Sequence, residues 1–362
     1  KPRLTSWKTP PAWGNRRHRP STSIFAHNEK ETIVFERKKE SDYFYIWKAL
    51  CCCLVIVIHY PFPGTAGEMI LAIARISVPF FFAVSGWYLF RDDDEKDQLE
   101  QLRSKLLKTV RLTLRVGVIC IAFAAAVSLP EGKISAGEWF AERFNIFEIL
   151  HLLVFDYGKM LESCAYHLWY LFAMINCYAV LYCGKQLERR FKRTWDGRSV
   201  MMMLLVALFI LEAIVKGHGS WYRNWLFVGM PFILMGWYAR QNMRNITRIP
   251  IFCGAVLSVA ESILFGRKEI YLGTALTVLL ILQRTHFSDF DWLPDRMKDF
   301  LVYVGKNLSS RIYYYHVLVL VTLQIQTDIR NGWLPILVLL ISFLLAELLY
   351  RIEMIRCSKK AA

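Results

Sequence analysis

The chain has 362 residues, of which 55% are hydrophobic, 15% are aromatic and only 21% are charged, and its mean hydropathy is +0.30. Soluble chains are less apolar and about a quarter of their residues are charged, so the composition excludes a secreted domain, a nuclear factor and a cytosolic enzyme. It favours an all-α integral membrane protein. The net charge of +15 fits either a membrane surface or a nucleic acid, and the placement of the charges decides between them.

The nine cysteines lie mostly inside apolar segments and have no paired metal-ligand spacing. Cysteines of this kind are typical of small buried hydrophobic residues. We therefore predict neither a disulfide framework nor a metal site.

The N-terminal segment 1–40 contains ten Lys and Arg residues and has neither the helical nor the strand period. We predict a disordered basic tail. It has no apolar segment that ends at a small-residue cleavage site, so it does not resemble a signal peptide.

A helix needs about 20 mostly apolar residues to cross ~30 Å of hydrocarbon. By this criterion residues 41–352 form a membrane domain with about ten transmembrane helices, and 353–362 form a short cytoplasmic tail. The seventh and eighth helices are short, and we interpret them as a hairpin around the polar joint 265–269. The predicted spans are 44–60, 69–90, 106–129, 166–183, 199–215, 225–239, 249–265, 270–284, 309–326 and 333–350.

The charges of the connecting segments predict the orientation. With the N-terminus in the cytoplasm, the inner segments hold 31 Lys and Arg residues and the outer segments hold 8. Because cytoplasmic loops are enriched in Lys and Arg, we predict that both termini are cytoplasmic. The same asymmetry explains the basic charge without a nucleic-acid partner; the expected partners are membrane lipids and a substrate.

The longest outer connection, 130–165, contains an apolar helical face made of Phe144, Phe147, Leu150, Leu153 and Val154. Such a face is typical of a helix that lies in the membrane interface. An ordinary amphipathic loop helix with no role in chemistry is the alternative.

Two ionisable residues lie near the outer end of the first two spans. His59 ends the first span, and Arg75 lies early in the second, which returns from the same side. Ionisable residues at membrane depth often line a functional cavity. An imidazole can accept a proton near neutral pH, and a guanidinium can bind a carboxylate or stabilise an oxyanion. The alternative is that both residues anchor helix ends in the interface.

Further polar residues are predicted at the same depth. His167 and Trp169 begin the fourth span, and Arg223 and Asn224 precede the sixth. Trp169 is typical of an interfacial anchor, whereas His167 can face the same cavity as His59. Arg223 and Asn224 are candidates for contacts with an acceptor sugar or carboxylate.

Two carboxylates, Glu212 and Glu261, end outward-running helices. Either one can orient a histidine, or both are simply solvated at the interface.

Several motifs, in this order along about 42–350, resemble the membrane-bound acyltransferase family 3, the O-acyltransferases of polysaccharides, peptidoglycan and antibiotics. The strongest is the second-span segment with an aromatic triplet, a small residue and Ser-Gly. In chain order, the first motifs are His59 near the end of the first span and Ala74 to Phe90. They are followed by His167-Leu168-Trp169-Tyr170-Leu171, by Asn224-Trp225-Leu226-Phe227 with Gly229, Pro231, Phe232 and Gly236, and by Gly305-Lys306-Asn307-Leu308-Ser309 with Ile312-Tyr313-Tyr314-Tyr315-His316.

The resemblance implies a multi-pass protein of the bacterial plasma membrane in which His59 is the catalytic base. It also implies that His316 belongs to the substrate region. The family has an Arg-x-x-Arg motif that is thought to meet acyl-CoA, and Lys108 and Arg111 occupy the equivalent place with Lys replacing the first Arg. Lys binds phosphate as a point charge without the planar fork of Arg. Anchoring by the positive-inside rule is the alternative for this basic stripe.

Two classes of function follow. In the first, acetyl-CoA or another acyl-CoA binds from the cytosol and donates its acyl group to a glycan or a small hydroxylated acceptor, with His59, Arg75 and His167 as the catalytic residues. No metal is required, because a thioester is already activated. The second class is a transporter of a small polar metabolite such as serine, since some similar membrane domains are fused to a serine racemase. These 362 residues contain no racemase, so we expect the enzyme.

Overall fold

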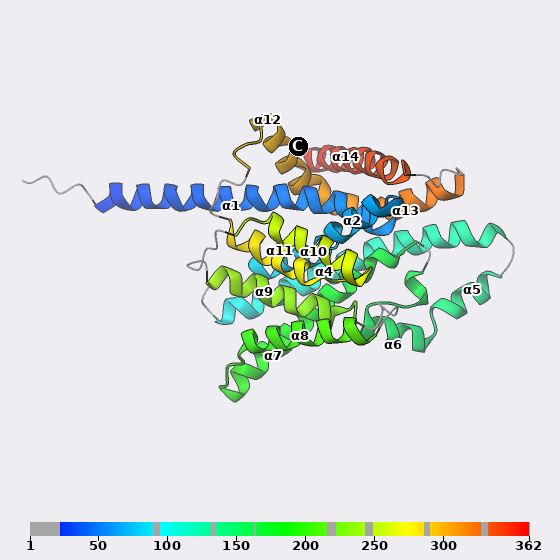
Figure 1. Ribbon diagram of the computed structural model, residues 1–362, viewed down its shortest axis with the longest axis horizontal. Helices are drawn as coiled ribbons and strands as arrows, with labels where there is room; N and C mark the ends of the chain where they lie inside the picture. Colours follow the sequence, from blue (N-terminus) through cyan, green and yellow to red (C-terminus); the bar gives the residue numbers. More distant parts are fainter. Residues whose placement is uncertain are drawn as a thin grey trace, which may run out of the picture.

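The computed structural model describes residues 22–89, 95–131, 135–162, 164–215, 222–242, 249–285, 290–326 and 332–361. Every regular element in these ranges is a helix, and most of the longer helices run side by side (Figure 1). The all-α fold class is therefore confirmed.

The longer helices have the following bounds. They are α1 (Thr22–His59), α2 (Gly64–Ala74), α3 (Ser77–Trp87), α4 (Glu95–Ser128), α5 (Ala136–Arg143), α6 (Ile146–Phe155), α7 (Trp169–Phe191), α8 (Gly197–Ile214), α9 (Met230–Gln241), α10 (Phe252–Phe265), α11 (Leu272–Gln283), α12 (Asp295–Tyr303), α13 (Ser309–Gln326) and α14 (Leu334–Ala361). Short helical turns lie between them: η1 (Leu129–Glu131), η2 (Lys159–Leu161), η3 (Tyr166–Leu168), η5 (Trp225–Gly229) and η6 (Val304–Leu308).

Five helical segments of the described chain are long and apolar enough to cross a bilayer. They are Lys38–His59, Gly64–Trp87, Asp97–Ser128, Gly197–Ile214 and Leu334–Lys359. These segments identify a membrane protein. The predicted number of ten spans and the predicted orientation are not decided by them.

The predicted hairpin of the seventh and eighth spans is confirmed as α10 and α11, which pack against each other. They have 14 and 12 residues, so each is only about 20 Å long. Glycines permit the close approach, because a Cβ on Gly273 would lie 2.2 Å from the backbone nitrogen of Ser258.

The predicted disordered tail is wrong where the structure describes it. Residues 22–40 belong to α1, and 1–21 lie outside the described residues. The segment 22–40 contains no Pro or Gly and is rich in Glu and Lys, which favour helix, so the helix of the first span propagates into it. Glu40 holds this part of α1 to the bundle by accepting a 2.8 Å hydrogen bond from Trp87 Nε1.

The C-terminal prediction also changes. Helix α14 continues to Ala361, so the described residues of the predicted short tail 353–362 form the end of that helix. Leu334, Pro335 and the apolar residues after them begin the helix, and the charged turns near its end remain exposed.

The second predicted span is interrupted at Arg75 and Ile76, between α2 and α3. Pro79 explains the break, because it has no N–H to donate to the carbonyl of Arg75 four residues earlier. Ser77 Oγ instead donates a 2.7 Å hydrogen bond to Ala74 O. The break places Arg75 at an irregular point of the backbone, where its side chain faces a cavity.

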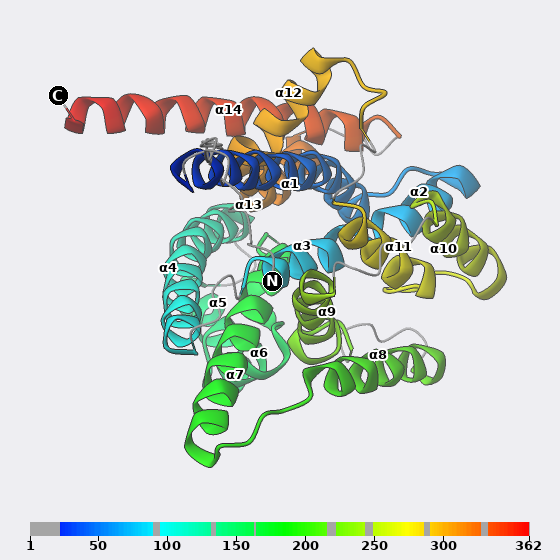
Figure 2. The ribbon, with the colours of Figure 1, turned by 90° about the vertical axis from the view of Figure 1, so that its left-hand side faces the viewer.

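Helices α3 and α9 form the centre of the bundle, with α4, α7, α8, α11 and α1 around them (Figure 2). Their backbones touch: a Cβ on Gly86 would lie 1.9 Å from Ile233 O, and one on Gly236 would lie 1.8 Å from Ala83 O. The Ser85-Gly86 pair of the sequence motif is therefore a site of close helix packing. The neighbouring Phe80 and Phe82 are fully buried in the same core.

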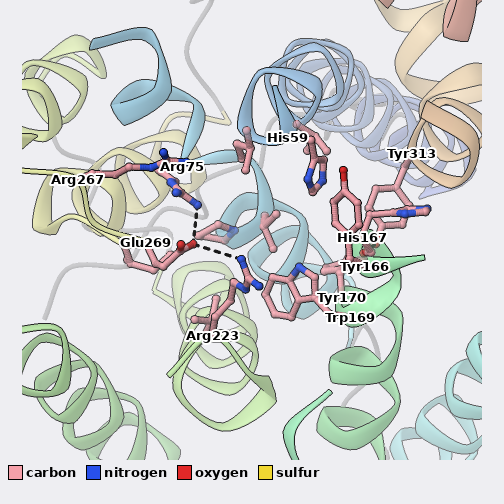
Figure 3. Close-up of a pocket in the computed structure, with 16 residues that line it drawn as sticks. His59, Arg75, Tyr166, His167, Trp169, Tyr170, Arg223, Arg267, Glu269 and Tyr313 are labelled. Carbon is pink, nitrogen blue, oxygen red and sulfur yellow. Dashed lines mark hydrogen bonds and ion pairs between the residues drawn. The ribbon is translucent and has the colours of Figure 1, made fainter. Parts of the chain in front are cut away.

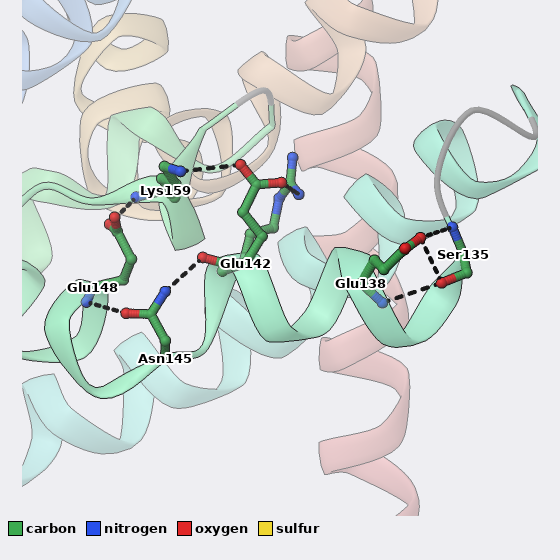
Figure 4. Close-up of polar contacts among 7 residues, drawn as sticks. Ser135, Glu138, Glu142, Asn145, Glu148 and Lys159 are labelled. Atoms are coloured by element: carbon green, nitrogen blue, oxygen red, sulfur yellow. Dashed lines mark hydrogen bonds and ion pairs between the residues drawn. The ribbon is translucent and has the colours of Figure 1, made fainter.

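The predicted interfacial segment forms two short helices, α5 and α6, joined at Phe144 and Asn145 (Figure 4). Asn145 begins α6 by accepting a 3.0 Å hydrogen bond from Glu148 N. On α6, Phe147 is 79% exposed and Leu150 and Leu153 are about half exposed. This unpartnered apolar face is consistent with a helix that lies in the membrane interface.

Candidate functional site

A cavity of about 240 Å³ lies where the end of α1, the α2–α3 break, the start of α7 and the segment 266–270 meet (Figure 3). We call it the histidine cavity. It contains the three residues predicted to be catalytic, from elements far apart in the sequence. Its polar and aromatic lining residues are His59, Arg75, Tyr166, His167, Trp169, Tyr170, Arg223, Arg267, Glu269 and Tyr313.

Three histidines pack together at one side of this cavity. The ring centroid of His316 lies 5.1 Å from that of His59 and 5.2 Å from that of His167. His59 and His167 line the cavity, whereas His316 is fully buried behind them. No group of metal-ligating side chains with a suitable arrangement occurs in the described ranges.

Hydrogen bonds define which ring nitrogens carry hydrogen. His316 Nδ1 donates to Tyr313 O at 2.8 Å, and His167 Nε2 donates to Tyr314 O at 3.0 Å. In a neutral ring the other nitrogen is then an acceptor. Neither His316 Nε2 nor His167 Nδ1 has a hydrogen-bond partner among the described residues. Each of these buried rings therefore keeps one nitrogen available to accept a proton or a hydrogen bond.

The other side of the cavity is a group of arginines around one carboxylate. Glu269 accepts a 2.5 Å hydrogen bond from Arg75 Nη1 and lies 3.8 Å from Arg223 Nη1 (Figure 3). Arg223 also lies over the ring of Trp169, 5.7 Å from its centroid. Arg267 lines the cavity from the same segment as Glu269.

Neither Glu212 nor Glu261 has a hydrogen bond to a histidine in the described part of the chain. Glu212 Oε1 accepts a 2.7 Å hydrogen bond from Ile270 N, and Glu261 Oε2 accepts a 2.8 Å hydrogen bond from Gly273 N. Glu261 thereby satisfies backbone donors at the start of α11, which a helix leaves without partners. Both carboxylates fix the backbone of the segment that carries Arg267 and Glu269.

Asn224, predicted to contact substrate, has a structural position. It is buried, does not line the cavity, and accepts hydrogen bonds from Leu226 N and Phe227 N at 3.0 and 3.1 Å. It therefore begins η5, a π-helical turn closed by the Gly229 N to Asn224 O hydrogen bond of 3.2 Å. The neighbouring Arg223 and the predicted anchor Trp169 do line the cavity.

Buried Asp156 ties η5 to α6 and α7. Asp156 Oδ2 accepts a 2.6 Å hydrogen bond from Trp225 N, and Oδ1 accepts one of 2.7 Å from Asn176 Nδ2. Burial raises the pKa of Asp156 to about 7, against the opposing effect of these two donors. The carboxylate therefore changes charge near neutral pH, close to the residues that support Arg223.

A second cavity of about 490 Å³, which we call the lysine cavity, lies farther toward the N-terminal part of α1. Lys48, Lys105 and Lys306 line it. Lys48 and His59 are eleven residues apart on α1, so these two lining residues lie about 16 Å apart along that helix. Tyr170 and Tyr313 line both cavities, and their ring centroids are 5.6 Å apart. These two rings separate the cavities.

The predicted basic stripe lies beside the lysine cavity. Lys105 and Thr109 line it from α4, whereas Lys108 and Arg111 are exposed and are not among the lining residues. At about 100° per residue, Lys108 is offset by about 60° from Lys105 on the side away from Thr109, and this offset is sufficient to leave Lys108 outside the lining. The structure therefore does not bring Lys108 and Arg111 together with the other candidates.

Sequence reasoning missed Arg267 and Glu269. The joint 265–269 was interpreted only as a polar connection, although it carries three charges between two apolar helices. That charge density at the predicted depth of His59 was the available signal.

Comparisons with known proteins agree with the motif resemblance. A family model described as an acyltransferase domain, that of the acyltransferase 3 family, matches residues 42–351. An Enterococcus faecalis protein named amino-acid racemase is 24% identical over 358 residues, which cover 87% of this chain and 47% of the relative. The chain thus spans about half the length of that curated relative. No solved structure matches the chain.

Proposed function

The chain belongs to the acyltransferase 3 family, and on that premise we propose that it is an O-acyltransferase of the bacterial plasma membrane. It moves an acyl group, acetyl in the simplest case, from cytosolic acyl-CoA to a hydroxyl of an envelope glycan or another extracytoplasmic acceptor. The observation that supports this most strongly is the pair of cavities that meet at Tyr170 and Tyr313. One is lined by lysines and the other by histidines and arginines.

The lysine cavity has the chemistry of the donor end. Phosphates bind Lys as a strongly attractive point charge, and the diphosphate of CoA carries several negative charges. With the diphosphate near Lys105 and Lys306, the pantetheine arm extends along α1 toward Tyr170 and Tyr313. The thioester then lies at the boundary between the two cavities.

The histidine cavity has the chemistry of the transfer step. His59 accepts the proton of the acceptor hydroxyl while that oxygen attacks the thioester carbonyl carbon. Arg75 stabilises the negative charge that develops on the carbonyl oxygen. The carbon–sulfur bond then breaks, and the CoA thiolate takes up the proton from His59 to leave as the free thiol. The product is an ester, and His59 returns to its neutral state.

His167 and His316 support this step by position. His167 lines the cavity next to Tyr166, whose ring centroid lies 5.0 Å from that of His59. The acceptor nitrogen of His316 faces the histidine cluster, where it can receive a hydrogen bond and hold one tautomer of His59. The other nitrogen of His59 is then available for the acceptor proton.

The donor site is tested with two double variants, one inside the lysine cavity and one on the exposed stripe beside it. Lys105→Gln with Lys306→Gln should weaken acetyl-CoA binding to the purified full chain by at least about tenfold, because charge-assisted contacts contribute ~1.5–3 kcal/mol each. Lys108→Gln with Arg111→Gln is the matched control and should change binding by less than about threefold if it serves only as an anchor. Stronger weakening by the control pair would return the donor site to the exposed stripe.

The transfer itself is tested in cells that express the wild type or His59→Ala. Mass spectrometry of the envelope glycans should find an O-acetyl ester with the wild type only. Uptake of radiolabelled serine that depends on the wild-type chain, without any ester, would instead support a transporter.

A further inference from the structure

The histidine cavity has an excess of positive charge. Among the residues that the structure describes, its lining includes Arg75, Arg223 and Arg267, with Glu269 as the one carboxylate (Figure 3). Three guanidinium groups against one carboxylate leave two positive charges without compensation in the lining. Arg267 is exposed and the Arg223 side chain is partly exposed, so a charged ligand can reach both.

The three arginines are not equivalent. Arg75 is 6% exposed and is paired with Glu269 at 2.5 Å, so its charge is largely balanced. The Arg223 side chain is 34% exposed and its ion-pair distance to Glu269 is longer, at 3.8 Å. Because Glu269 is mostly committed to Arg75, Arg223 and Arg267 carry the uncompensated charge.

The backbone around these two arginines is fixed before any ligand binds. Glu212 and Glu261 accept backbone hydrogen bonds from Ile270 and Gly273 on the segment that follows Arg267. The ring of Trp169 lies against the guanidinium of Arg223. An ordered backbone on this segment and the contact of Arg223 with Trp169 lower the entropy that is lost when a ligand binds.

The positive charge continues beyond the histidine cavity. A neighbouring cavity of about 640 Å³ shares Arg267 and is also lined by Lys268, Tyr222 and Glu212. Glu212 is 7% exposed, and its Oε2 has no hydrogen-bond partner in the part of the chain that the structure describes. A polar acceptor that is larger than the histidine cavity can therefore extend past Arg267 toward Lys268.

We propose that Arg223 and Arg267 select an acceptor that carries an anionic group, a carboxylate or a phosphate, near the hydroxyl that becomes acylated. This inference rests on the proposed function for the acylation step. The two guanidinium groups bind the anion by charge-assisted hydrogen bonds, and the bound anion places its neighbouring hydroxyl toward His59. A neutral sugar of the same shape lacks this anchor.

The test is equilibrium binding of radiolabelled sugars to the purified full chain in lipid nanodiscs. Glucuronate probes a carboxylate, glucose 6-phosphate probes a phosphate, and glucose is the neutral match for both. We expect at least one anionic sugar to bind at least about tenfold more tightly than glucose, and we expect added salt to weaken that binding. Arg223→Gln and Arg267→Gln should each remove most of the preference. Arg356→Gln, an exposed arginine on α14, should retain it.

Binding and transfer separate the two proposals. Equal or undetectable binding of all three sugars, or a preference that survives both substitutions, overturns the anion site. Anion binding without transfer of radiolabelled acetyl from acetyl-CoA to any acceptor supports the anion site and contradicts the acyltransferase step. The preferred arm, glucuronate or glucose 6-phosphate, identifies the anionic group.

Discussion

His59→Gln is the substitution that most directly examines the transfer step. Gln retains hydrogen bonding and approximate size, but it does not accept a proton near neutral pH. His59 lines the histidine cavity and is half-buried, so the smaller polar side chain can be accommodated without a buried charge. We therefore expect normal expression and membrane insertion together with a large loss of acyl transfer.

The size of this loss follows from the role of the residue. Removal of a general base typically lowers a rate by about 10² to 10⁴-fold, which corresponds to ~2.7–5.5 kcal/mol in activation free energy. An anchoring or packing histidine has no such effect. We expect at least about a hundredfold loss in turnover, with little change in the affinity for acetyl-CoA, because Lys48, which lines the lysine cavity, lies about 16 Å from His59 along α1.

Two further histidines calibrate the measurement. His316→Gln should lose less than His59→Gln, because His316 is fully buried and acts on His59 by contact. His151→Gln is the matched control, since His151 is exposed on α6 and donates from Nδ1 to Tyr157 O at 2.7 Å. Turnover is followed as release of free CoA thiol by membranes of equal protein content. Near-wild-type turnover by His59→Gln would refute the general-base assignment.

Three other predictions concern packing, pH and topology. Gly236→Ala should destabilise the chain by about 1–3 kcal/mol or more in a thermal unfolding assay in detergent, because its Cβ would lie 1.8 Å from a backbone oxygen. Gly117 has open space around it, so Gly117→Ala should be neutral or stabilising in the same assay. The pKa of Asp156 is raised to about 7, so its contribution to stability is complete below about pH 4 and disappears as the pH rises through 7. The melting temperature of Asp156→Asn should lack that part of the pH dependence, and parallel plots of melting temperature against pH for the wild type and the variant would contradict the assignment. Reporter fusions at Ser135 and Gly197 should report opposite sides of the membrane, with Ser135 outside, and matching signals would contradict the predicted topology.

The sequence was sufficient to predict the membrane class and three of the residues that line the histidine cavity. Apolar segments of membrane length have few alternative structures, and family motifs place His59, Arg75 and His167 at helix ends that the structure brings together. Their roles stay predictions. The order of the motifs along the chain carried more information than any single residue.

What the sequence did not supply was the direction of side chains and the limits of helices. Lys105 and Lys108 are three residues apart on α4, yet only Lys105 of the two lines the lysine cavity, because the rotation of α4 depends on its packing against α7. Asn224 is buried as a helix-capping residue, while its neighbour Arg223 lines the cavity. Adjacent residues at the same depth can thus have different functions, and only tertiary packing distinguishes them.

The partition formed by Tyr170 and Tyr313 links the two classes of function to one physical requirement. A transporter must let a whole polar solute pass between the cavities, so both rings and their neighbours have to move far enough to open a continuous polar path. Acyl transfer requires only that a thin pantetheine arm reaches the boundary while the acceptor stays on the other side. The two ring centroids are 5.6 Å apart, and Tyr170 also packs against Phe81 of α3. The described lining carries lysines on one side of the rings and histidines with arginines on the other, which is the arrangement expected where an anionic acyl donor and a hydroxylated acceptor meet from opposite sides.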